Sequence, residues 1–412
     1  MKNFKEFLKA GHLPTLFSSL LYFDFCFAIW VLNGAMAPFI SEQFHLTPIQ
    51  KGLMLSIPVL SGALMRFPLG ILAQYIGRKR AAMIEMGMII LGLSYGYFFV
   101  NSYREVLFMG IPLGLAGASF GVALSLGSGS FPPQYKGLAA GIAGAGNSGA
   151  VIAQLCAPPL AAKYGWQSVY GYAIPFMFLP MIVLFFFAKE PPDQERKNLK
   201  DYLKVVMEKD AWTFNLIYVI TFGGFIGLTT FLPTFFHDQY GISKTQVGQY
   251  AALITIMASI LRVVGGWAAD KVGGINMLSA ILIITILSLL AASALPAPWI
   301  ITIILIITFS ALGAGNGSVF QLVPLRFPFA TAIAMSLVGE IGGLGGGLVP
   351  NFMAFSKEYS GSYALGFIAI ALLAGAALIA LRIVQGRWSC TWVVEGGKAE
   401  VRVKMVPALE VG

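Results

Sequence analysis

The chain has 412 residues, of which 57% are hydrophobic and only 11% are charged, and its formal net charge is +9. A soluble protein of this length exposes far more charge, so the composition excludes a soluble protein and indicates a membrane protein. The positive charge does not indicate nucleic-acid binding, because the basic residues cluster between apolar runs, as topology signals do. The cysteines, Cys26, Cys156 and Cys390, are too few and too widely spaced for a disulfide framework or a metal site.

The first apolar run follows a basic N-terminal arm and extends from about Leu13 to Ile40. It is too long for the core of a signal peptide, which has about 7–15 apolar residues, so we interpret it as a membrane span. Further runs are long enough to cross a bilayer as helices of about 20 residues. They lie near 50–73, 81–100, 105–129, 137–161, 167–188, 211–236, 245–268, 275–295, 299–323, 330–354 and 362–385. The sequence therefore predicts an all-α membrane protein with 12 transmembrane helices.

A long polar segment, 189–210, separates the first six runs from the last six. Its later half places apolar residues at helical spacing, namely Leu199, Tyr202, Leu203 and Val206. This pattern indicates an amphipathic helix on the membrane surface, and a solvated linker fits it almost as well. We predict four parts of the chain: a six-helix half over 1–188, a cytoplasmic linker with an amphipathic helix over 189–210, a second six-helix half over 211–386 and a cytoplasmic tail over 387–412.

The distribution of lysine and arginine predicts the orientation. If the N-terminus is cytoplasmic, 20 of the 27 basic residues lie in cytoplasmic segments, 5 lie in external segments, and Arg66 and Arg262 lie inside spans. This bias fits the positive-inside rule, and we expect both termini to be cytoplasmic.

The two arginines inside spans occupy equivalent places in a repeat. Arg66 and Arg262 are 196 residues apart, and each is followed by glycine at +4 and at +11. By helical rise, Arg66 lies about 20 Å from the flanking basic residues, so its side chain cannot extend to the membrane surface. A charge at that depth costs at least about 2.5–3.5 kcal/mol, so each arginine needs an explanation.

Two interpretations account for the buried arginines. Each could pair with a carboxylate, and the spans offer Asp24, Glu85 and Glu340. Alternatively both arginines face a central cavity, which we favour because acidic residues are so few in the spans. Arginine keeps its charge, and its planar fork binds oxyanions with two hydrogen bonds. Such a cavity would attract small planar anions.

Several motifs carry a resemblance to a known family. A shift of 196 residues also lays Tyr22 on Tyr218, and parallel six-helix repeats with a site between them are the architecture of major facilitator transporters. The segment GILAQYIGRKR resembles that superfamily's loop between spans two and three, although Gln74 stands where an acidic residue is usual. The stretch Tyr22–Pro38, the two arginine motifs, AGIAGAGNSGA and GEIGGLGGG resemble the nitrate/nitrite porter family of this superfamily.

The resemblance implies a substrate site and a function. The implied site consists of Arg66 and Arg262 as substrate ligands, Phe120, Tyr218 and Phe222 as walls, and Asn147 as a group that orients the anion. Each of the last four residues also fits ordinary packing, an interfacial position or an interhelical hydrogen bond. We expect a secondary transporter of nitrate or nitrite in the cytoplasmic membrane, working by alternating access as a proton symporter or a nitrate/nitrite exchanger.

Two glycine-rich stretches are interpreted as conformational elements. Small residues let helices approach and slide, as a rocking transporter requires, and ordinary close packing fits them too. These residues are Gly141, Gly144, Gly146, Gly149, Gly339, Gly342, Gly343, Gly345 and Gly346. Glu340 is a candidate for proton coupling, because its ionised form would compete with the anion for an arginine. A structural role fits Glu340 equally well.

Other function classes have less support. An enzyme needs a nucleophile, base or metal constellation, and His12, His45 and His237 lie at span ends on opposite sides of the membrane. The glycines lack the context of a phosphate loop. We therefore expect no enzymatic activity, cofactor or metal. We expect a monomer in the lipid bilayer with nitrate and nitrite as substrates, and with protons as candidate co-substrates. An organic-carboxylate exchanger and an anion channel stay open as alternatives.

Overall fold

The computed structural model describes residues 2–192, 204–328 and 330–398. This part of the chain contains 12 helical segments that are long and apolar enough to cross a membrane, which confirms the predicted all-α fold. The segments are Leu13–Gln43, Pro48–Ile76, Arg78–Phe98, Tyr103–Ser128, Leu138–Tyr164, Trp166–Phe187, Lys209–Tyr240, Val247–Val272, Gly274–Ser293, Pro298–Arg326, Ile333–Ser360 and Ala364–Thr391.

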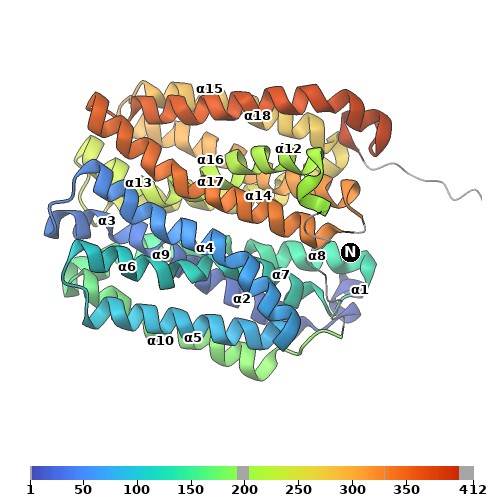
Figure 1. Ribbon diagram of the computed structural model, residues 1–412, viewed down its shortest axis with the longest axis horizontal. Helices are drawn as coiled ribbons and strands as arrows, with labels where there is room; N and C mark the ends of the chain where they lie inside the picture. The colour runs from blue at the N-terminus through green and yellow to red at the C-terminus, as the bar shows by residue number, and fades with distance from the viewer. Residues whose placement is uncertain (1, 193–203, 329, 399–412) are drawn as a thin grey trace, which may run out of the picture.

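The helices form two groups, one from each half of the chain, which lie side by side in Figure 1. The first group contains α2 (Leu13–Trp30), α3 (Leu32–Gln43), α4 (Pro48–Ile76), α5 (Arg78–Phe98), α6 (Tyr103–Gly114), α7 (Ser119–Ser128), α8 (Pro133–Ala143), α9 (Gly149–Tyr164) and α10 (Trp166–Phe187). The second contains α12 (Lys209–Tyr218), α13 (Gly224–Tyr240), α14 (Val247–Val272), α15 (Gly274–Ser293), α16 (Pro298–Arg326), α17 (Thr331–Ser360) and α18 (Ala364–Thr391).

A short helix, α1 (Lys2–Ala10), precedes the first group and lies at the same end of the bundle as the last turns of α18 (Figure 1). We call this end the termini face and the opposite end the far end. The predicted amphipathic helix falls mostly outside the described residues, since Leu199, Tyr202 and Leu203 are not among them. Val206 lies in a helical turn over 204–207, just before α12.

Several spans change their helical geometry partway along. Span four tightens into a 3-10 turn, η1 (Leu115–Ala118), and span five into another, η2 (Gly144–Ser148). Span seven widens into a π-helical turn, η3 (Val219–Gly223). Such turns inside helices frequently mark functional sites. Three of the predicted site residues lie within or next to these turns.

The glycines at +11 of the arginine repeat end their helices. Gly77 separates α4 from α5 with a φ of 95°, and Gly273 separates α14 from α15 with a φ of 101°. Glycine adopts positive φ at no steric cost, so the repeat encodes two equivalent tight turns. The carboxylate of Glu190 accepts hydrogen bonds from the backbone N–H groups of Arg78 (2.7 Å) and Lys79 (2.9 Å). These bonds satisfy donors that the start of α5 would otherwise leave free.

Close helix crossings join the two halves. The contacting pairs include α4 with α17, α3 with α13 and α9 with α14. A Cβ on Gly34 would lie 2.8 Å from the Cα of Thr230, and one on Gly52 would lie 2.5 Å from the Cβ of Ala354. Small residues at these crossings therefore let the backbones of the two halves touch.

Ion pairs also join the halves at the far end. Nζ of Lys51 lies 2.5 Å from Oδ2 of Asp238, and the two side chains are only 15% and 17% exposed. The hydroxyl of Tyr363 donates to the same carboxylate at 3.2 Å. A second ion pair connects Lys244 to Glu42. The far end is thus closed by contacts between the halves.

At the termini face, Asp210 holds the second half together. Its carboxylate accepts hydrogen bonds from Nε of Arg326 (2.6 Å) and from Nε1 of Trp388 (2.8 Å), and it pairs with Arg387. The Trp388 side chain is buried and stacks on Phe214, with ring centroids 4.8 Å apart. The last turns of α18 therefore pack on α12, which also contacts α16.

Candidate substrate site

Arg66 and Arg262 converge on one aromatic ring between the two halves. Arg66 lies on α4 and is 6% exposed, and Arg262 lies on α14 and is 8% exposed. The guanidinium carbon of each arginine lies 5.4 Å from the centre of the Phe120 ring. The two guanidinium carbons are therefore no farther apart than twice that distance. The sequence repeat brings two buried charges to one place.

Further aromatic rings enclose the two guanidinium groups. Cζ of Arg66 also lies 5.2 Å from the ring centre of Phe222 and 5.5 Å from that of Trp30. Cζ of Arg262 lies 5.8 Å from the ring centre of Phe320. Aromatic faces attract cations, so these rings stabilise the buried arginines without neutralising them.

Tyr218 connects the rings of this enclosure. Its ring stacks on that of Phe222 with centroids 5.2 Å apart, and its centroid lies 5.1 Å from that of Phe320. The Tyr218 hydroxyl interacts electrostatically with both arginines. The hydroxyl oxygen of Tyr218 is not positioned to form a hydrogen bond with any residue that the structure describes. The three predicted wall residues thus surround the arginine pair.

The hydrogen bonds of the site leave several polar atoms without partners. Nε of Arg66 donates to the carbonyl of Gly117 at 3.0 Å, and Nη1 donates to the carbonyl of Gly339. Nη2 of Arg66, Nη1 of Arg262 and Oη of Tyr218 are buried and have no hydrogen-bond partner among the described residues. Buried polar atoms without partners are costly, and other described parts of the spans contain them too, for example the amide of Asn316. The convergence of such atoms beside the two arginines fits a site that binds a small anion.

Carboxylates do not neutralise the arginine pair in the part of the chain that the structure describes. Asp24 and Glu85 accept hydrogen bonds from a serine and a tyrosine of the first half instead. Glu340 interacts electrostatically with Arg66 without forming an ion pair. The interpretation in which each arginine pairs with a carboxylate therefore finds no support in the geometry, and the site keeps an excess of positive charge.

Asn147 lies on η2, which packs against α14. Its side chain is 1% exposed, and neither atom of its amide has a hydrogen-bond partner among the described residues. A shift of 196 residues relates Asn147 to Gly343, where a Cβ would lie 3.8 Å from Cζ of Arg66. The repeat thus relates Asn147 to a position beside an arginine, while the structure describes no contact of its side chain with either guanidinium group.

The glycines of span eleven face two directions. Gly339, Gly343 and Gly347 face the first half, where a Cβ would lie 3.0 Å from Nη1 of Arg66, 2.9 Å from Cβ of Ala63 and 2.5 Å from Cγ of Leu60, respectively. The other three pack within the second half, against α12, η3 and α13, and they are Gly342, Gly345 and Gly346. One helix therefore packs closely on both halves through alternate glycines.

The glycines of span five lie inside the first half. A Cβ on Gly146 would lie 2.7 Å from the backbone nitrogen of Asp24, and Gly149 packs on the backbone oxygen of the same residue. Gly144 has only ordinary van der Waals neighbours, and Gly141 has no neighbour within 4 Å. The close contacts of this stretch are with α2 of the same half.

Two residues that contact the arginines, Trp30 and Phe320, are not among the residues predicted from the sequence. A signal for Phe320 exists, because the pair Gly117 and Phe120 in span four recurs 200 residues later as Gly317 and Phe320. Trp30 has no comparable signal in a chain with 32 phenylalanine, 15 tyrosine and 7 tryptophan residues.

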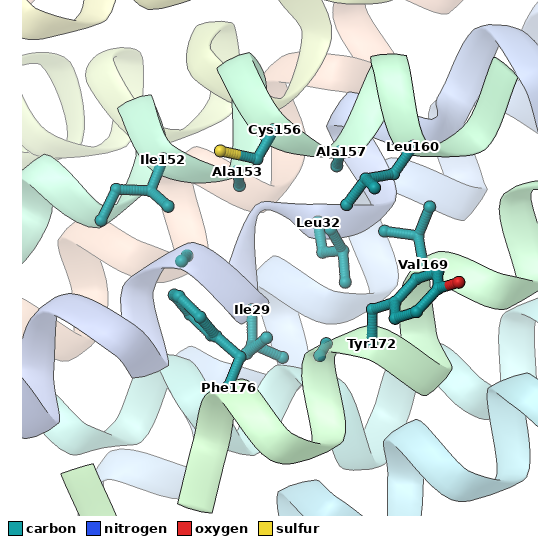
Figure 2. Close-up of a pocket in the computed structure, with 12 residues that line it drawn as sticks. Ile29, Leu32, Ile152, Ala153, Cys156, Ala157, Leu160, Val169, Tyr172 and Phe176 are labelled. Carbon is teal, nitrogen blue, oxygen red and sulfur yellow. The ribbon is translucent and has the colours of Figure 1, made fainter. Parts of the chain in front are cut away.

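A separate pocket of about 100 Å³ lies within the first half, among the four helices α2, α3, α9 and α10 (Figure 2). Figure 2 shows Cys156, Tyr172 and Phe176 among the residues that line it. None of the lining residues is charged, and none belongs to the predicted site. An apolar lining offers an anion no compensation for its lost hydration, so this pocket does not suit an anionic ligand.

Twelve spans in two related halves, with a charged site between them, define a multi-pass membrane transporter. Residues 18–350 match the family model described as Major Facilitator Superfamily. The chain belongs to this superfamily, whose members are transporters and not enzymes.

Curated relatives cover most of the chain. A nitrite extrusion protein of Bacillus subtilis (strain 168) is 29% identical over 354 residues, which span 86% of this chain and 89% of the relative. A probable nitrate transporter, NarT, of Staphylococcus carnosus (strain TM300) is 31% identical over 359 residues, covering 86% and 92%. A probable nitrate/nitrite antiporter, NarK1, of Thermus thermophilus is 28% identical over 403 residues, covering 89% and 90%.

Solved structures share the fold at lower identity. The human organic anion transporter MFSD10 (TETRAN) superposes with a TM-score of 0.70 at 14% identity, covering 90% of this chain and 99% of that one. A bacterial homolog of the human lysosomal transporter Spinster, in an inward-facing and occupied conformation, superposes with a TM-score of 0.68 at 19% identity, covering 89% and 95%. These similarities concern the fold alone.

Proposed function

We propose that this protein transports nitrate, nitrite or both across the cytoplasmic membrane. The observation that carries the proposal is the pair of buried guanidinium groups around Phe120, with unpartnered polar atoms beside them. A permanently charged pair in a low-dielectric enclosure attracts a small anion strongly. The names of the relatives concern nitrate and nitrite, which supports this choice of anion.

The chemistry of the enclosure favours a small planar anion with one charge. A guanidinium fork donates two parallel hydrogen bonds to two oxygens in one plane, and nitrate and nitrite both present such a pair. A tetrahedral dianion such as sulfate loses much more hydration on entering the membrane. Two arginines and one hydroxyl group offer too few donors to replace that hydration.

Charge repulsion would couple anion binding to the conformational cycle. Two guanidinium groups at roughly 8 Å repel each other by about 2 kcal/mol at an effective dielectric constant of 20. An anion between them removes this repulsion, so the halves close around the anion at the termini face more readily than they close without it. We infer alternating access, in which the two halves rock about the site and expose it to one side at a time.

Two modes of energy coupling fit this scheme. In proton symport, protonation of Glu340 would remove a competitor of the anion for Arg66, with which this carboxylate interacts. Exchange of nitrate for nitrite needs no titratable group. We assign the termini face to the cytoplasm, because the basic residues predominate there, and we take the monomer as the transporting unit.

Competition for uptake into liposomes tests the substrate. Purified protein is reconstituted, and uptake of labelled nitrate is measured with unlabelled nitrate, nitrite, formate or oxalate as competitor. We expect nitrate or nitrite to inhibit at concentrations about tenfold lower than formate or oxalate, a difference of about 1.4 kcal/mol in binding. Stronger inhibition by formate or oxalate would instead support an organic-carboxylate exchanger.

Counterflow separates a carrier from an anion channel, which would share the cationic constriction. Liposomes are loaded with unlabelled nitrate and diluted into a trace of labelled nitrate. A carrier with one site that alternates between sides concentrates the label inside, whereas a channel only equilibrates it. Absence of accumulation in liposomes that take up nitrate would contradict alternating access.

A further inference from the structure

The two arginines of the repeat form different bonds. Arg66 donates from Nε to the carbonyl of Gly117 at 3.0 Å and from Nη1 to the carbonyl of Gly339. The side chain of Arg262 has no hydrogen bond to a backbone carbonyl of the described residues; its Nη1 is buried without a partner, and the side chain interacts with the hydroxyl of Tyr218. The sequence repeat makes the two positions equivalent, so this difference comes from the packing around each arginine.

The bond from Arg66 to Gly339 crosses from the first half to the second. It belongs to the seam between α4 and α17, where Ser56 also donates to the carbonyl of Gly347 and Asn351 donates to Oγ of Ser56 at 2.7 Å. The two helices are antiparallel and run the length of the bundle. Of these bonds, the one made by Arg66 lies nearest the termini face and adjoins the substrate site.

The nitrogen atoms that hold Arg66 in place also belong to the two edges that a planar anion would use. A two-pronged bond uses either the Nη1 and Nη2 edge or the Nε and Nη2 edge of a guanidinium group. In Arg66 each of these edges shares one nitrogen with a backbone carbonyl, that of Gly117 or that of Gly339. Neither edge of Arg262 has such a competitor among the described residues.

We propose that Arg66 is an anion-operated latch between the two halves and that Arg262 is the anchor that holds the anion. The inference rests on the proposed function for the identity of the anion. When the anion takes the Nη1 and Nη2 edge of Arg66, it competes with the carbonyl of Gly339 for Nη1 and pulls the guanidinium group toward itself. The charge-assisted bond across the seam then weakens, so α17 separates from α4 more readily. The bond to Gly117 stays within the first half and keeps the guanidinium group oriented.

Gly339→Ala tests the latch without removing a charge. A Cβ at this position would lie 3.0 Å from Nη1 of Arg66, so the guanidinium group has to shift by a few tenths of an ångström, which disturbs its bond to the carbonyl of Gly339. Gly70→Ala is the matched control, because Gly70 lies one turn from Arg66 on α4 and a Cβ there would meet no atom within 4 Å.

Distances between spin labels report how far the two halves separate at the far end. The labels are attached at Asn101→Cys in the first half and Tyr359→Cys in the second, both at exposed positions, and the exposed Cys156 and Cys390 are replaced by serine. Without nitrate, we expect the variant at the latch to populate the separated state about fivefold more than the control variant. Equal distance distributions in the two variants would overturn the latch, whichever anion the protein carries.

Arg66→Lys and Arg262→Lys separate the two roles. Lysine keeps the charge but loses the fork, and nitrate binding to each purified variant is measured by calorimetry. We expect Arg262→Lys to weaken binding by about tenfold or more, and Arg66→Lys to weaken it by less than about threefold while removing the nitrate-dependent change in the spin-label distances. Equal losses of affinity would contradict the division of roles. A parent protein that binds no nitrate would contradict the proposed function, and the Gly339→Ala comparison would still decide the latch.

Discussion

The cost of burying the two guanidinium groups is offset by aromatic rings and backbone carbonyls instead of carboxylates. The centre of the Phe120 ring lies 5.4 Å from each guanidinium carbon. The carbonyl oxygens of Gly117 and Gly339 accept hydrogen bonds from Arg66. These partners are neutral, so they lower the cost of burial without cancelling the charge. A carboxylate beside each arginine would form a closed ion pair and leave little field to attract an anion.

Glu340 is the acidic group that interacts electrostatically with Arg66. We predict that Glu340→Gln uncouples nitrate uptake from an imposed pH gradient, because an amide neither exchanges a proton nor competes as an anion for the arginine. Uptake driven by a nitrate gradient should stay within about threefold of the parent, since the arginines are intact. Glu358→Gln, on an exposed turn of the same helix, is the control. Uptake by Glu340→Gln that still follows the pH gradient would exclude this residue as the coupling group.

For single residues, how uncommon a residue type is within the spans decides whether its role can be predicted from the sequence. Arg66 and Arg262 stand out because a charge deep in a span is costly and uncommon. Trp30 and Phe320 do not stand out, because aromatic residues are frequent throughout the spans. The bond from Arg66 to Gly339 could not be predicted, since every residue carries a carbonyl and only the packing of α4 on α17 selects one.

At the scale of elements, the halves meet along pairs of whole helices. Within α17, Gly339, Gly343 and Gly347 face the first half, while Gly342, Gly345 and Gly346 face the second. A helix with glycines on two opposite faces packs closely against both halves. A small displacement of α17 therefore changes its contacts with both halves at once. Hydropathy does not predict this, because it measures the average of a segment and not the direction of each residue.

The ion pair between Lys51 and Asp238 joins two elements of different halves at the far end. We predict that Lys51→Asp and Asp238→Lys each favour separation of the far ends by about fivefold, or about 1 kcal/mol, because each places like charges together. The double variant should return to within about twofold of the parent, since it restores the pair with reversed polarity. The spin labels at the far end measure the separation.

Lys163→Asp is the matched control for the charge reversals. Lys163 lies at the same end of the bundle, over the ring of its neighbour Tyr164, and it is not part of an ion pair that the structure describes. The control should leave the distance distribution unchanged. A double charge reversal that fails to restore the parent distribution would mean that Lys51 and Asp238 act separately and not as a pair.

The changes of helical geometry inside spans mark the limit of prediction at this scale. The number of spans follows from apolar runs of sufficient length, and it is confirmed. The turns η1, η2 and η3 do not follow from those runs, because a helix tightens or widens in response to what packs against it. Asn147, Tyr218 and Phe222 lie within or next to these turns, so their relative positions come from the fold and not from the pattern of hydropathy.

At the scale of the whole molecule, the fold relates the two ends of the bundle to opposite sides of a membrane. Ion pairs between the halves close the far end, and the described termini lie at the other end. The bias of basic residues predicts that the termini face is cytoplasmic. With that orientation, this conformation has its external side closed.

A native cysteine tests the orientation. Cys390 is exposed in the last turn of α18 at the termini face, whereas Cys26 is buried and Cys156, although exposed, lies inside a span beside the apolar pocket of the first half. We predict that a charged, membrane-impermeant maleimide labels the full-length protein in inverted membrane vesicles and not in intact cells, because the positive-inside rule places this face in the cytoplasm. Cys390→Ser should remove the label from the vesicles, which shows that the reagent reports this residue. Labelling of Cys390 in intact cells would reverse the orientation, and the ion pairs of the far end would then close the cytoplasmic side.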